Sequence, residues 1–444
     1  MAVISSAVVI YNNSSPSTDT GNAIDIRFND GMATRTVDNS LHVYKTNSSH
    51  NKIHSLRPAC DPQLNNASHT TQEVSSYGWE FSIVNRTTGF LDQTMDLIHK
   101  FLNLVAPTFT FFSFVFLLPP FYFFNFFLSI LRSVFSENVA GKVIVITGAS
   151  SGIGEHLAYE YGRRGARLAL TARREKSLQE IADRARDLGS PDVIVIRADV
   201  SKVDDCRRLV EETVNHFGRL DHLVNNAGIN TVCMFEDAPP DMSLFRAIMD
   251  TNFWGSVYTT RFAVPHLKNS KGKIVVMSSA ASWMNDPRTS VYNASKAALT
   301  AFFDTLRIEL GSEVKITIVT PGFIESEITQ GKFLQRDGNM EVQQDMRDVQ
   351  VSSIPVASAS GCAQAIVNSA SKGDRYLTQP SWFRVTYLWK MFFPELVEWG
   401  YILSHFSRPG APHQQAPSKK ILDFTGLKNV IYPSSIQSPE IKTD

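Results

Sequence analysis

Hydrophobic and polar positions follow three different patterns along the chain. The first 94 residues are rich in serine, threonine and asparagine and lack sustained periodicity, which favours a poorly ordered extension over a folded domain. From Phe101 to Leu131 no residue is charged. After residue 140, short apolar runs alternate with amphipathic stretches of helical length. We therefore predict four parts: a polar extension (1–94), a hydrophobic anchor (95–135), a globular domain (136–380) and an aromatic C-terminal segment with a tail (381–444).

The globular part is predicted to be an α/β domain. Its apolar runs read as buried strands at residues 142–147, 166–171, 193–198, 222–225, 273–278 and 315–320. Buried β-branched strands that alternate with helices imply a parallel sheet covered on both faces. Because the crossovers between parallel strands are right-handed, the expected fold is a doubly wound parallel sheet of the Rossmann type.

The uncharged segment is long enough to enter a membrane, since about 20 apolar residues cross a hydrocarbon core as a helix. Pro119 and Pro120 remove two amide donors and clash with the preceding turn. They favour a hairpin that enters and returns on one face, although an ordinary bilayer anchor stays open. A hairpin suits a phospholipid monolayer over neutral lipid, because both ends of the segment emerge on the same side. We expect an anchor at a lipid droplet or at the endoplasmic reticulum membrane.

Charge and cysteine content narrow the function further. The 444 residues include 43 basic and 43 acidic side chains, so nothing indicates a nucleic-acid partner. The four cysteines show neither CxxC nor any paired spacing, which argues against a disulfide framework and against a metal site of the zinc type. No N-terminal stretch combines basic residues with a long apolar run, as a secretory signal peptide would.

The first predicted strand of the domain runs into the sequence TGASSGIG, which indicates a dinucleotide site. Glycine permits a positive φ and carries no Cβ, so backbone amides at the start of the next helix can approach a pyrophosphate. The setting between a strand and a helix makes the motif credible. The residues expected to bind the cofactor here are Gly148, Ser150, Ser151, Gly152, Ile153 and Gly154.

The second strand ends in TARRE, where an NAD enzyme would carry an acid for the ribose 2′-hydroxyl. Arg173 and Arg174 stand there instead, and a guanidinium can hold a 2′-phosphate in a bidentate contact. This predicts NADP(H), while the alternative is that both arginines are solvated surface charges. Further cofactor contacts are expected at the carboxyl ends of the third and fourth strands, from Asp199, Val200, Asn226, Ala227 and Gly228.

The candidate catalytic residues lie in and before a helix predicted at 290–310. Tyr292 and Lys296 are four residues apart, hence on one face of this helix. A free phenol titrates near pKa ~10, and a nearby ammonium favours the phenolate, so we expect Lys296 to lower the pKa of Tyr292. Ser279 closes the preceding strand, where its hydroxyl could bind a substrate carbonyl. Asn252 falls within a predicted helix, where an asparagine often only packs or faces solvent.

These motifs, over about residues 138–380, resemble those of the short-chain dehydrogenase/reductase family: TGxxxGxG, NNAG, an upstream asparagine, a serine and YxxxK, in this order. The resemblance implies that Tyr292 donates or accepts the proton and that Ser279 polarises the carbonyl. It also implies that Lys296 binds the nicotinamide ribose and that Asn252 holds a water of a proton relay. In the sequence TPGFIESE, it implies that the nicotinamide is bordered by Pro321, Gly322 and Ile324.

A narrower resemblance, from about Met95 to the end, is to the plant steroleosins, which are hydroxysteroid dehydrogenases of oil bodies. The stretches APTFTFFSFVFLLPPFYFF, TYLWKMFFPELVEWG and SPEIKTD carry it. It implies the 11-beta or 17-beta oxidation or reduction of a steroid with NADP(H), in some members also with NAD(H), and leaves a homodimer open. The sequon at Asn293 beside Tyr292 favours a domain that faces the cytosol. A droplet coat protein with incidental turnover and a reductase of another lipid ketone stay as alternatives.

Overall fold

The computed structural model describes the side chains of residues 93–406 and 416–437. Before residue 93 it describes the backbone of five short strands and the helical backbone from Thr71. The chain divides into two compact units, Met1–Phe116 and Leu117–Asp444, and each is described by itself.

The first unit contains an antiparallel sheet in the order β1-β2-β3-β4-β5. Its strands are β1 (Val9–Ile10), β2 (Ile24–Arg27), β3 (Met32–Val37), β4 (Ser40–Lys45) and β5 (His54–Ser55). The side chains of this sheet lie outside the described residues, so the expectation of a poorly ordered extension at 1–94 stays a prediction.

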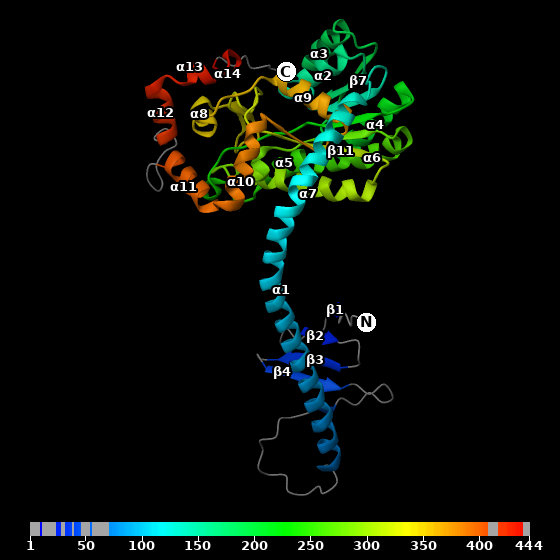
Figure 1. Ribbon diagram of the computed structural model, residues 1–444, viewed down its shortest axis with the longest axis vertical. Coiled ribbons are helices and arrows are strands. Elements are labelled where there is room, and N and C mark those ends of the chain that lie inside the picture. Colours follow the sequence, from blue (N-terminus) through cyan, green and yellow to red (C-terminus); the bar gives the residue numbers. More distant parts are fainter. Residues whose placement is uncertain are drawn as a thin grey trace, which may run out of the picture. The chain divides into compact units, whose positions relative to one another are not determined.

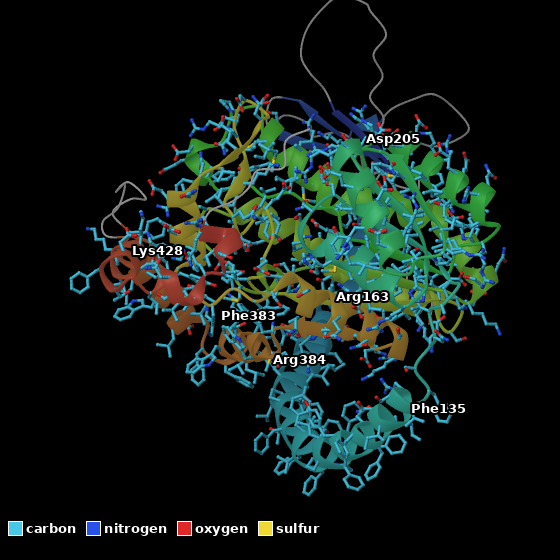
Figure 2. The ribbon with its side chains drawn as sticks, turned by 90° about the horizontal axis from the view of Figure 1, so that it is seen from above. Phe135, Arg163, Asp205, Phe383, Arg384 and Lys428 are labelled. Atoms are coloured by element: carbon cyan, nitrogen blue, oxygen red, sulfur yellow. The ribbon has the colours of Figure 1, made fainter. Side chains whose placement is uncertain are left out.

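Helix α1 (Thr71–Val134) contains the predicted anchor. The most apolar 18-residue window within Gln93–Val134 has a mean hydropathy of 1.9, and no residue of this part is buried. By length and composition, Gln93–Val134 is a candidate membrane span. Around it the side chains radiate outward as far as Phe135 (Figure 2). A helix satisfies its backbone groups internally, which is what a hydrocarbon environment demands.

The predicted hairpin is not what the structure has, because α1 continues through Pro119 and Pro120. The two prolines lack only the amides that would bond the carbonyls of Val115 and Phe116, and such a loss can be absorbed as a kink rather than a reversal. A reversal would free the backbone groups of a whole turn.

The second unit is built on a sheet of parallel strands in the order β14-β11-β10-β9-β6-β7-β8, which confirms the predicted fold class (Figure 1). The strands are β6 (Val143–Thr147), β7 (Arg167–Ala172), β8 (Val193–Arg197), β9 (His222–Asn225), β10 (Lys273–Met277), β11 (Lys315–Pro321) and β14 (Tyr376–Gln379). Only β14, a short edge strand, was missing from the prediction. It has just four residues and only one of them is buried, so it carries no apolar run.

The period-2 geometry of the strands gives the sheet two apolar faces. On one face, Ile144 and Ile146 pack against α2 (Gly152–Arg163), α3 (Glu175–Asp187) and α9 (Ala359–Lys372). On the other, Val143 and Val145 pack against α4 (Val203–Phe217), α6 (Gly255–Ser270) and α7 (Ser290–Leu310). The strands are therefore buried on both sides, as their near-continuous apolar sequence predicted.

The remaining elements lie around the carboxyl edge of the sheet and along the C-terminal part. They are η1 (Phe235–Asp237), α5 (Ser243–Met249), η2 (Asp250–Trp254), η3 (Ala280–Ser282), β12 (Lys332–Leu334), β13 (Met340–Val342), α8 (Gln344–Val351), η4 (Ser381–Phe383), α10 (Arg384–Phe392), α11 (Pro394–His405), α12 (Pro417–Thr425), α13 (Lys428–Ile431) and α14 (Ser434–Gln437). The last three helices dock on α8 through a small apolar cluster that contains Val351, Leu422 and Tyr432.

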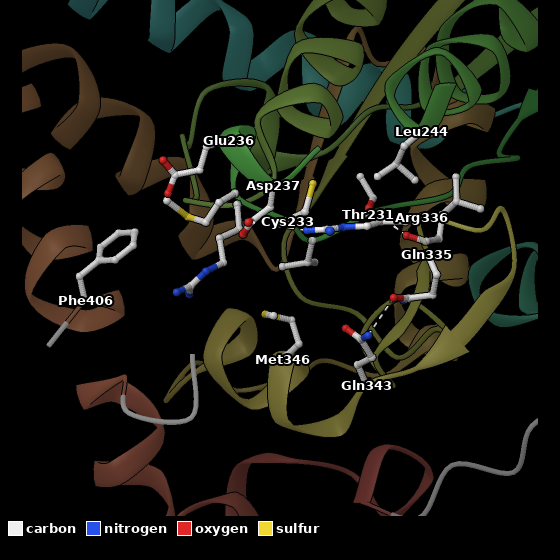
Figure 3. A pocket seen from close by; sticks show the side chains of 14 residues that line it. Thr231, Cys233, Glu236, Asp237, Leu244, Gln335, Arg336, Gln343, Met346 and Phe406 are labelled. Carbon is white, nitrogen blue, oxygen red and sulfur yellow. Dashed lines mark hydrogen bonds and ion pairs between the residues drawn. The ribbon is translucent and has the colours of Figure 1, made fainter. Parts of the chain in front are cut away.

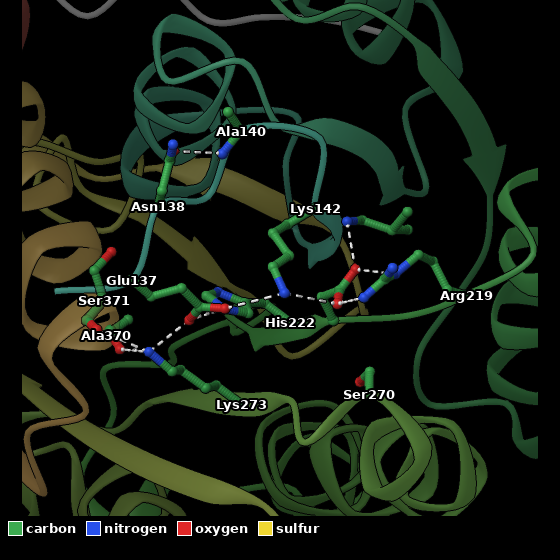
Figure 4. Close-up of polar contacts among 12 residues, drawn as sticks. Glu137, Asn138, Ala140, Lys142, Arg219, His222, Ser270, Lys273, Ala370 and Ser371 are labelled. Carbon is green, nitrogen blue, oxygen red and sulfur yellow. Dashed lines mark hydrogen bonds and ion pairs between the residues drawn. The ribbon is translucent and has the colours of Figure 1, made fainter. Parts of the chain in front are cut away.

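A charged cluster fastens the segment after α1 to the opposite, amino-terminal edge of the sheet (Figure 4). The Glu137 carboxylate lies 2.6 Å from the Lys273 ammonium, 3.2 Å from His222 and 3.5 Å from Lys142. Burial alone would raise the pKa of Glu137, but hydrogen bonds and charge from His222 and Lys273 lower it well below its ordinary value. The carboxylate is therefore the charge that allows Lys273 to be buried.

We predict that Glu137→Gln lowers the free energy of unfolding at pH 7 by about 3 kcal/mol, because it leaves a buried ammonium without its counter-charge. The measurement is a urea titration of the purified full-length protein in detergent, followed by tryptophan fluorescence. Since the pKa of Glu137 is depressed in the fold, its stabilisation is complete above its ordinary pKa of 4.5 and is lost as the pH falls below it. The difference in the free energy of unfolding between Glu137→Gln and the wild type should therefore become smaller below pH 4.5.

A matched control is Glu313→Gln, which removes an exposed partner of Lys268. Surface pairs contribute less than about 1 kcal/mol, so this variant should unfold like the wild type. Equal stabilities for Glu137→Gln and Glu313→Gln would contradict the role given to Glu137.

Candidate active site

The turn between β6 and α2 requires its glycines. Gly148 and Gly152 have φ values of +64° and +57°, which residues with a Cβ rarely adopt. A Cβ on Gly148 would lie 2.7 Å from the Cα of Ala227, and a Cβ on Gly154 would collide with the carbonyl oxygen of Gly148 and the Asn226 amide. The backbone at the start of α2 is thus laid bare, as an anion-binding helix start needs.

The NNAG segment after β9 holds this turn in place. The Asn226 side-chain amide donates to the carbonyls of Thr147 (2.9 Å) and Gly148 (3.0 Å). In return, the Thr147 hydroxyl oxygen accepts the backbone amides of Asn226 (2.9 Å) and Ala227 (3.1 Å). Asn226 therefore positions the glycine turn, a role that the sequence analysis had not distinguished from cofactor contact.

Of the two arginines after β7, the structure turns only one toward the glycine turn. Arg174 donates to the hydroxyls of Ser150 (3.1 Å) and Ser151 (3.0 Å), while Arg173 is exposed. Arg174 also forms a bidentate ion pair with Glu327, with distances of 2.6 and 2.9 Å. Glu327 was missed by the sequence analysis, because its loop is far from β7 in sequence and no motif spans the two.

The carboxyl end of β8 places Asp199 and Val200 at the start of α4. The Asp199 carboxylate accepts the amide (3.0 Å) and the hydroxyl (2.8 Å) of Ser201. Val200 is buried, and a Cβ on Gly255 would lie 2.8 Å from it. Both residues are at the edge predicted for the cofactor, and their cofactor-binding role stays a prediction.

The candidate catalytic pair lies on the first turns of α7, which begins at Ser290 as predicted. The Ser278 hydroxyl donates to the Lys296 carbonyl (3.1 Å) and lies 2.7 Å from the Thr300 hydroxyl, which fixes α7 against the end of β10. The Lys296 ammonium donates to the Met277 carbonyl (2.8 Å) and lies 5.7 Å from the centre of the Tyr292 ring. The two side chains therefore share one site.

The direction of the tyrosine shift corrects the sequence-based expectation. Burial raises the pKa of Tyr292 to about 12; a hydrogen bond with Ser279 opposes this rise and the Asp286 carboxylate adds to it. The Lys296 ammonium, 5.7 Å from the centre of the ring, does not outweigh the effect of burial on the pKa of Tyr292. Burial instead lowers the pKa of Lys296 itself to about 8.

Asn252 is fully buried in η2, a π-helical turn between α5 and α6 rather than a regular helix. Its amide oxygen accepts the Ile229 amide (2.8 Å), and its amide nitrogen donates to the Ile229 carbonyl (3.0 Å) and the Ser295 hydroxyl (3.1 Å). A Cβ on Gly228 would lie 3.4 Å from both Asn252 and Lys296. The wider turn thus brings Asn252 to the catalytic pair, and π-turns often mark functional sites.

Pro321 ends β11, and the role of Pro321, Gly322 and Ile324 beside a nicotinamide stays a prediction. The Ser279 hydroxyl donates to the Pro321 carbonyl (3.4 Å), so Pro321 does border the catalytic residues. Gly322 has no room for a Cβ because the Phe383 ring occupies that space. The Ile324 side chain is buried in the core, so only its backbone could approach a ligand.

Aromatic residues of the C-terminal segment lie beside this site. The Trp283 indole, four residues after Ser279, donates to the Thr386 hydroxyl of α10 (3.0 Å) and packs edge-on against Tyr387. No residue of α10 is buried. Of α11, only His405 is buried.

A separate cavity of about 460 Å³ lies beyond the NNAG segment (Figure 3). It is lined by Thr231, Val232, Cys233, Met234, Glu236, Asp237, Leu244, Arg288, Leu334, Gln335, Arg336, Gln343, Met346 and Phe406. None of the candidate catalytic residues is among them. No cluster that could hold a metal occurs in the part of the chain that the structure describes.

Comparison with known proteins agrees with this geometry. The family model for short chain dehydrogenase matches residues 142–337. The chain is 64% identical over 350 residues to 11-beta-hydroxysteroid dehydrogenase A of Arachis hypogaea and 62% identical over 350 residues to that of Sesamum indicum. Each match covers 79% of this chain and all of the relative.

A solved structure supports the fold. The short chain dehydrogenase/reductase of Burkholderia phymatum in complex with NAD matches with a TM-score of 0.51 and 25% identity, over 59% of this chain and 96% of that one. The glycine turn and the site beside it suit a nicotinamide cofactor, which is what that protein binds. The chain therefore belongs to the short-chain dehydrogenase/reductase family.

Proposed function

We propose that this oxidoreductase uses NADP(H) to interconvert a secondary alcohol and a ketone on a steroid or sterol-like substrate. The observation that carries the proposal is the convergence of Ser279, Tyr292 and Lys296 at the edge of the sheet that bears the glycine turn. The relatives named 11-beta-hydroxysteroid dehydrogenase support the substrate class. Arg174 beside Ser150 and Ser151 supports the phosphorylated cofactor.

Tyr292 is the proton donor in the proposed reduction. The bound nicotinamide supplies or accepts the hydride. With its pKa raised to about 12, the phenol stays protonated at neutral pH and can give its proton to the carbonyl oxygen of the substrate. Ser279 donates a hydrogen bond to the same oxygen and polarises it. At neutral pH, Tyr292 is therefore in the protonated form that the reduction of a ketone requires.

Lys296 and Asn252 act behind the tyrosine in this proposal. The Lys296 ammonium, with a pKa lowered to about 8, holds the nicotinamide ribose and can pass a proton on near neutral pH. Asn252 and Lys296 both lie close to Gly228, and the family resemblance assigns the water of a proton relay to Asn252. We assign the remaining cofactor contacts to the glycine turn, Asp199, Val200 and the NNAG segment, as the sequence predicts.

We further propose that the protein works at an oil-body or endoplasmic reticulum surface, with its catalytic domain on the cytosolic side. The apolar part of α1 from Gln93 to Val134 supports an anchor. Helices α10 and α11 add exposed aromatic side chains, among them Trp389, Phe392 and Trp399, of the kind found at membrane interfaces. Because α10 contacts Trp283, an apolar substrate could pass from lipid to the site. We keep the four proposed parts of the chain: the polar extension (1–94), the anchor (95–135), the globular domain (136–380) and the C-terminal segment (381–444).

We predict that Tyr292→Phe lowers the rate of NADPH oxidation with a steroid ketone by at least about a hundredfold, because it removes the proton donor. The dissociation constant of NADPH should stay close to that of the wild type. A matched control is Tyr376→Phe, which removes a phenol of the edge strand β14 that donates a hydrogen bond to Asp304 of α7. Equal rates for Tyr292→Phe and the wild type would remove the catalytic claim. Separately, a panel of steroid and other lipid ketones tested with the wild type would define its substrate.

The raised pKa of Tyr292 predicts opposite pH profiles for the two directions. Oxidation needs the phenolate, whose fraction rises about tenfold per pH unit below the pKa, so the rate of alcohol oxidation should rise between pH 7 and pH 9. Reduction needs the phenol, which stays protonated over this range, so its rate should not rise. Steady-state rates in both directions check this, and an oxidation rate that is flat or falls would contradict the assignment.

We predict that deletion of residues 101–131 lowers the fraction of protein that floats with oil bodies in cell fractionation. The additional changes Phe392→Glu and Trp399→Glu should remove the remainder, because each replaces an aromatic side chain that would bury in the interface with a carboxylate. Ile308→Glu is the control, since Ile308 is 82% exposed on α7 and is not assigned to the membrane. Undiminished flotation of the deleted protein would show that α1 is not the targeting element.

A further inference from the structure

Glu327, in the loop after β11, is held at the cofactor site by three partners. Its carboxylate forms the bidentate pair with Arg174, accepts the Ser151 hydroxyl (3.1 Å) and lies 3.1 Å from the Lys332 ammonium. The side chains of Glu327 and Arg174 are 23% and 14% exposed. The pair is therefore partly shielded from water, which strengthens it relative to a surface pair.

The loop that carries Glu327 lies directly on the glycine turn. A Cβ built on Gly152 would lie 3.1 Å from the Ser326 Cβ and 3.2 Å from the Ser326 Cα. This approach brings Glu327 against Ser151 and Arg174, the groups that the proposed function gives to the 2′-phosphate. Carboxylate and phosphate are the two anions that a guanidinium binds in the same bidentate way.

We propose that Glu327 is a specificity-determining residue, whose carboxylate stands in for the 2′-phosphate of the cofactor and must be displaced from Arg174 when that phosphate binds. The inference rests on the proposed NADP(H) function. A cofactor with a free 2′-hydroxyl can enter while the ion pair with Arg174 persists, whereas a phosphorylated one must break or share it. Glu327 thus reduces the preference for NADP(H) that Arg174 alone would give.

Two features of the loop suit an exchange of this kind. Burial alone would raise the pKa of Glu327, but the charges and hydrogen bonds of Arg174 and Lys332 lower it, so the carboxylate stays charged and competes at neutral pH. Lys332 begins β12, five residues after Glu327, and shares the carboxylate with Arg174. It offers the displaced carboxylate a second cation, so that displacement does not leave a bare buried charge.

The test measures cofactor affinity rather than turnover. NADPH, NADH, 2′-AMP and 5′-AMP are titrated calorimetrically into the full-length protein in detergent. For Glu327→Gln we expect NADPH and 2′-AMP to bind about tenfold more tightly, because the carboxylate no longer competes with the 2′-phosphate for Arg174. A tenfold change corresponds to about one charge-assisted hydrogen bond. The affinities for NADH and 5′-AMP should change by less than about twofold, which is below the effect of a single such bond.

The matched control is Glu325→Gln, which removes the same charge from the same loop. Glu325 accepts the Ala359 amide (3.1 Å) and the Ser435 hydroxyl (2.8 Å) rather than Arg174, so all four affinities should stay as in the wild type. Lys332→Met is a second, independent variant. It removes the other cation that binds Glu327, so the displaced carboxylate would lose its second partner. The affinity for NADPH should therefore fall relative to the affinity for NADH.

The outcomes separate this inference from the proposed function. Weaker NADPH binding by Glu327→Gln would mean that the carboxylate only orders Arg174. An equal gain in affinity for NADPH and NADH would mean that Glu327 obstructs the binding of both cofactors. Either result overturns the inference. Arg174→Ala tests the proposed function, because it should weaken NADPH and 2′-AMP selectively. If it does so while Glu327→Gln changes nothing, only the inference fails; if it leaves NADPH unchanged, the NADP(H) assignment fails.

Discussion

The site depends on a close approach of two backbone segments at the carboxyl edge of the sheet. The turn after β6 and the NNAG segment after β9 touch so closely that Gly148 and Gly154 admit no side chain. Reciprocal hydrogen bonds between Thr147 and Asn226 hold the two segments together. Parallel strands deliver both segments to this edge, so the fold itself brings the glycine turn next to α7.

Buried charge is used differently at the two edges of the sheet. At the amino-terminal edge, Lys273 is matched by Glu137 and serves stability. At the carboxyl edge, Lys296 has the Met277 carbonyl as its hydrogen-bond acceptor, and burial lowers its pKa to about 8. A buried ammonium held only by a neutral group titrates near neutral pH, which suits proton transfer rather than stability.

Local pattern predicted most of this architecture, and contacts between distant segments account for what it missed. Apolar runs located six of the strands, and the spacing of Tyr292 and Lys296 placed them on one helical face, since both signals are local. The predicted direction of the Tyr292 pKa shift was wrong because the pKa of this phenol depends first on its burial, which the sequence does not show. Likewise, the two prolines did not reveal that α1 continues through Pro119 and Pro120, since a proline can either kink a helix or end it.

Glu327 shows why a motif does not determine cofactor choice. The sequence TARRE supplies a guanidinium, yet its strength toward a phosphate depends on the anion that already holds it. Glu327 reaches Arg174 from a loop 153 positions away, and the tight approach of Ser326 to Gly152 is what brings it there. In the proposed function, cofactor selectivity therefore follows from the balance between two anions for one cation, and the loop after β11 sets that balance as much as the end of β7 does.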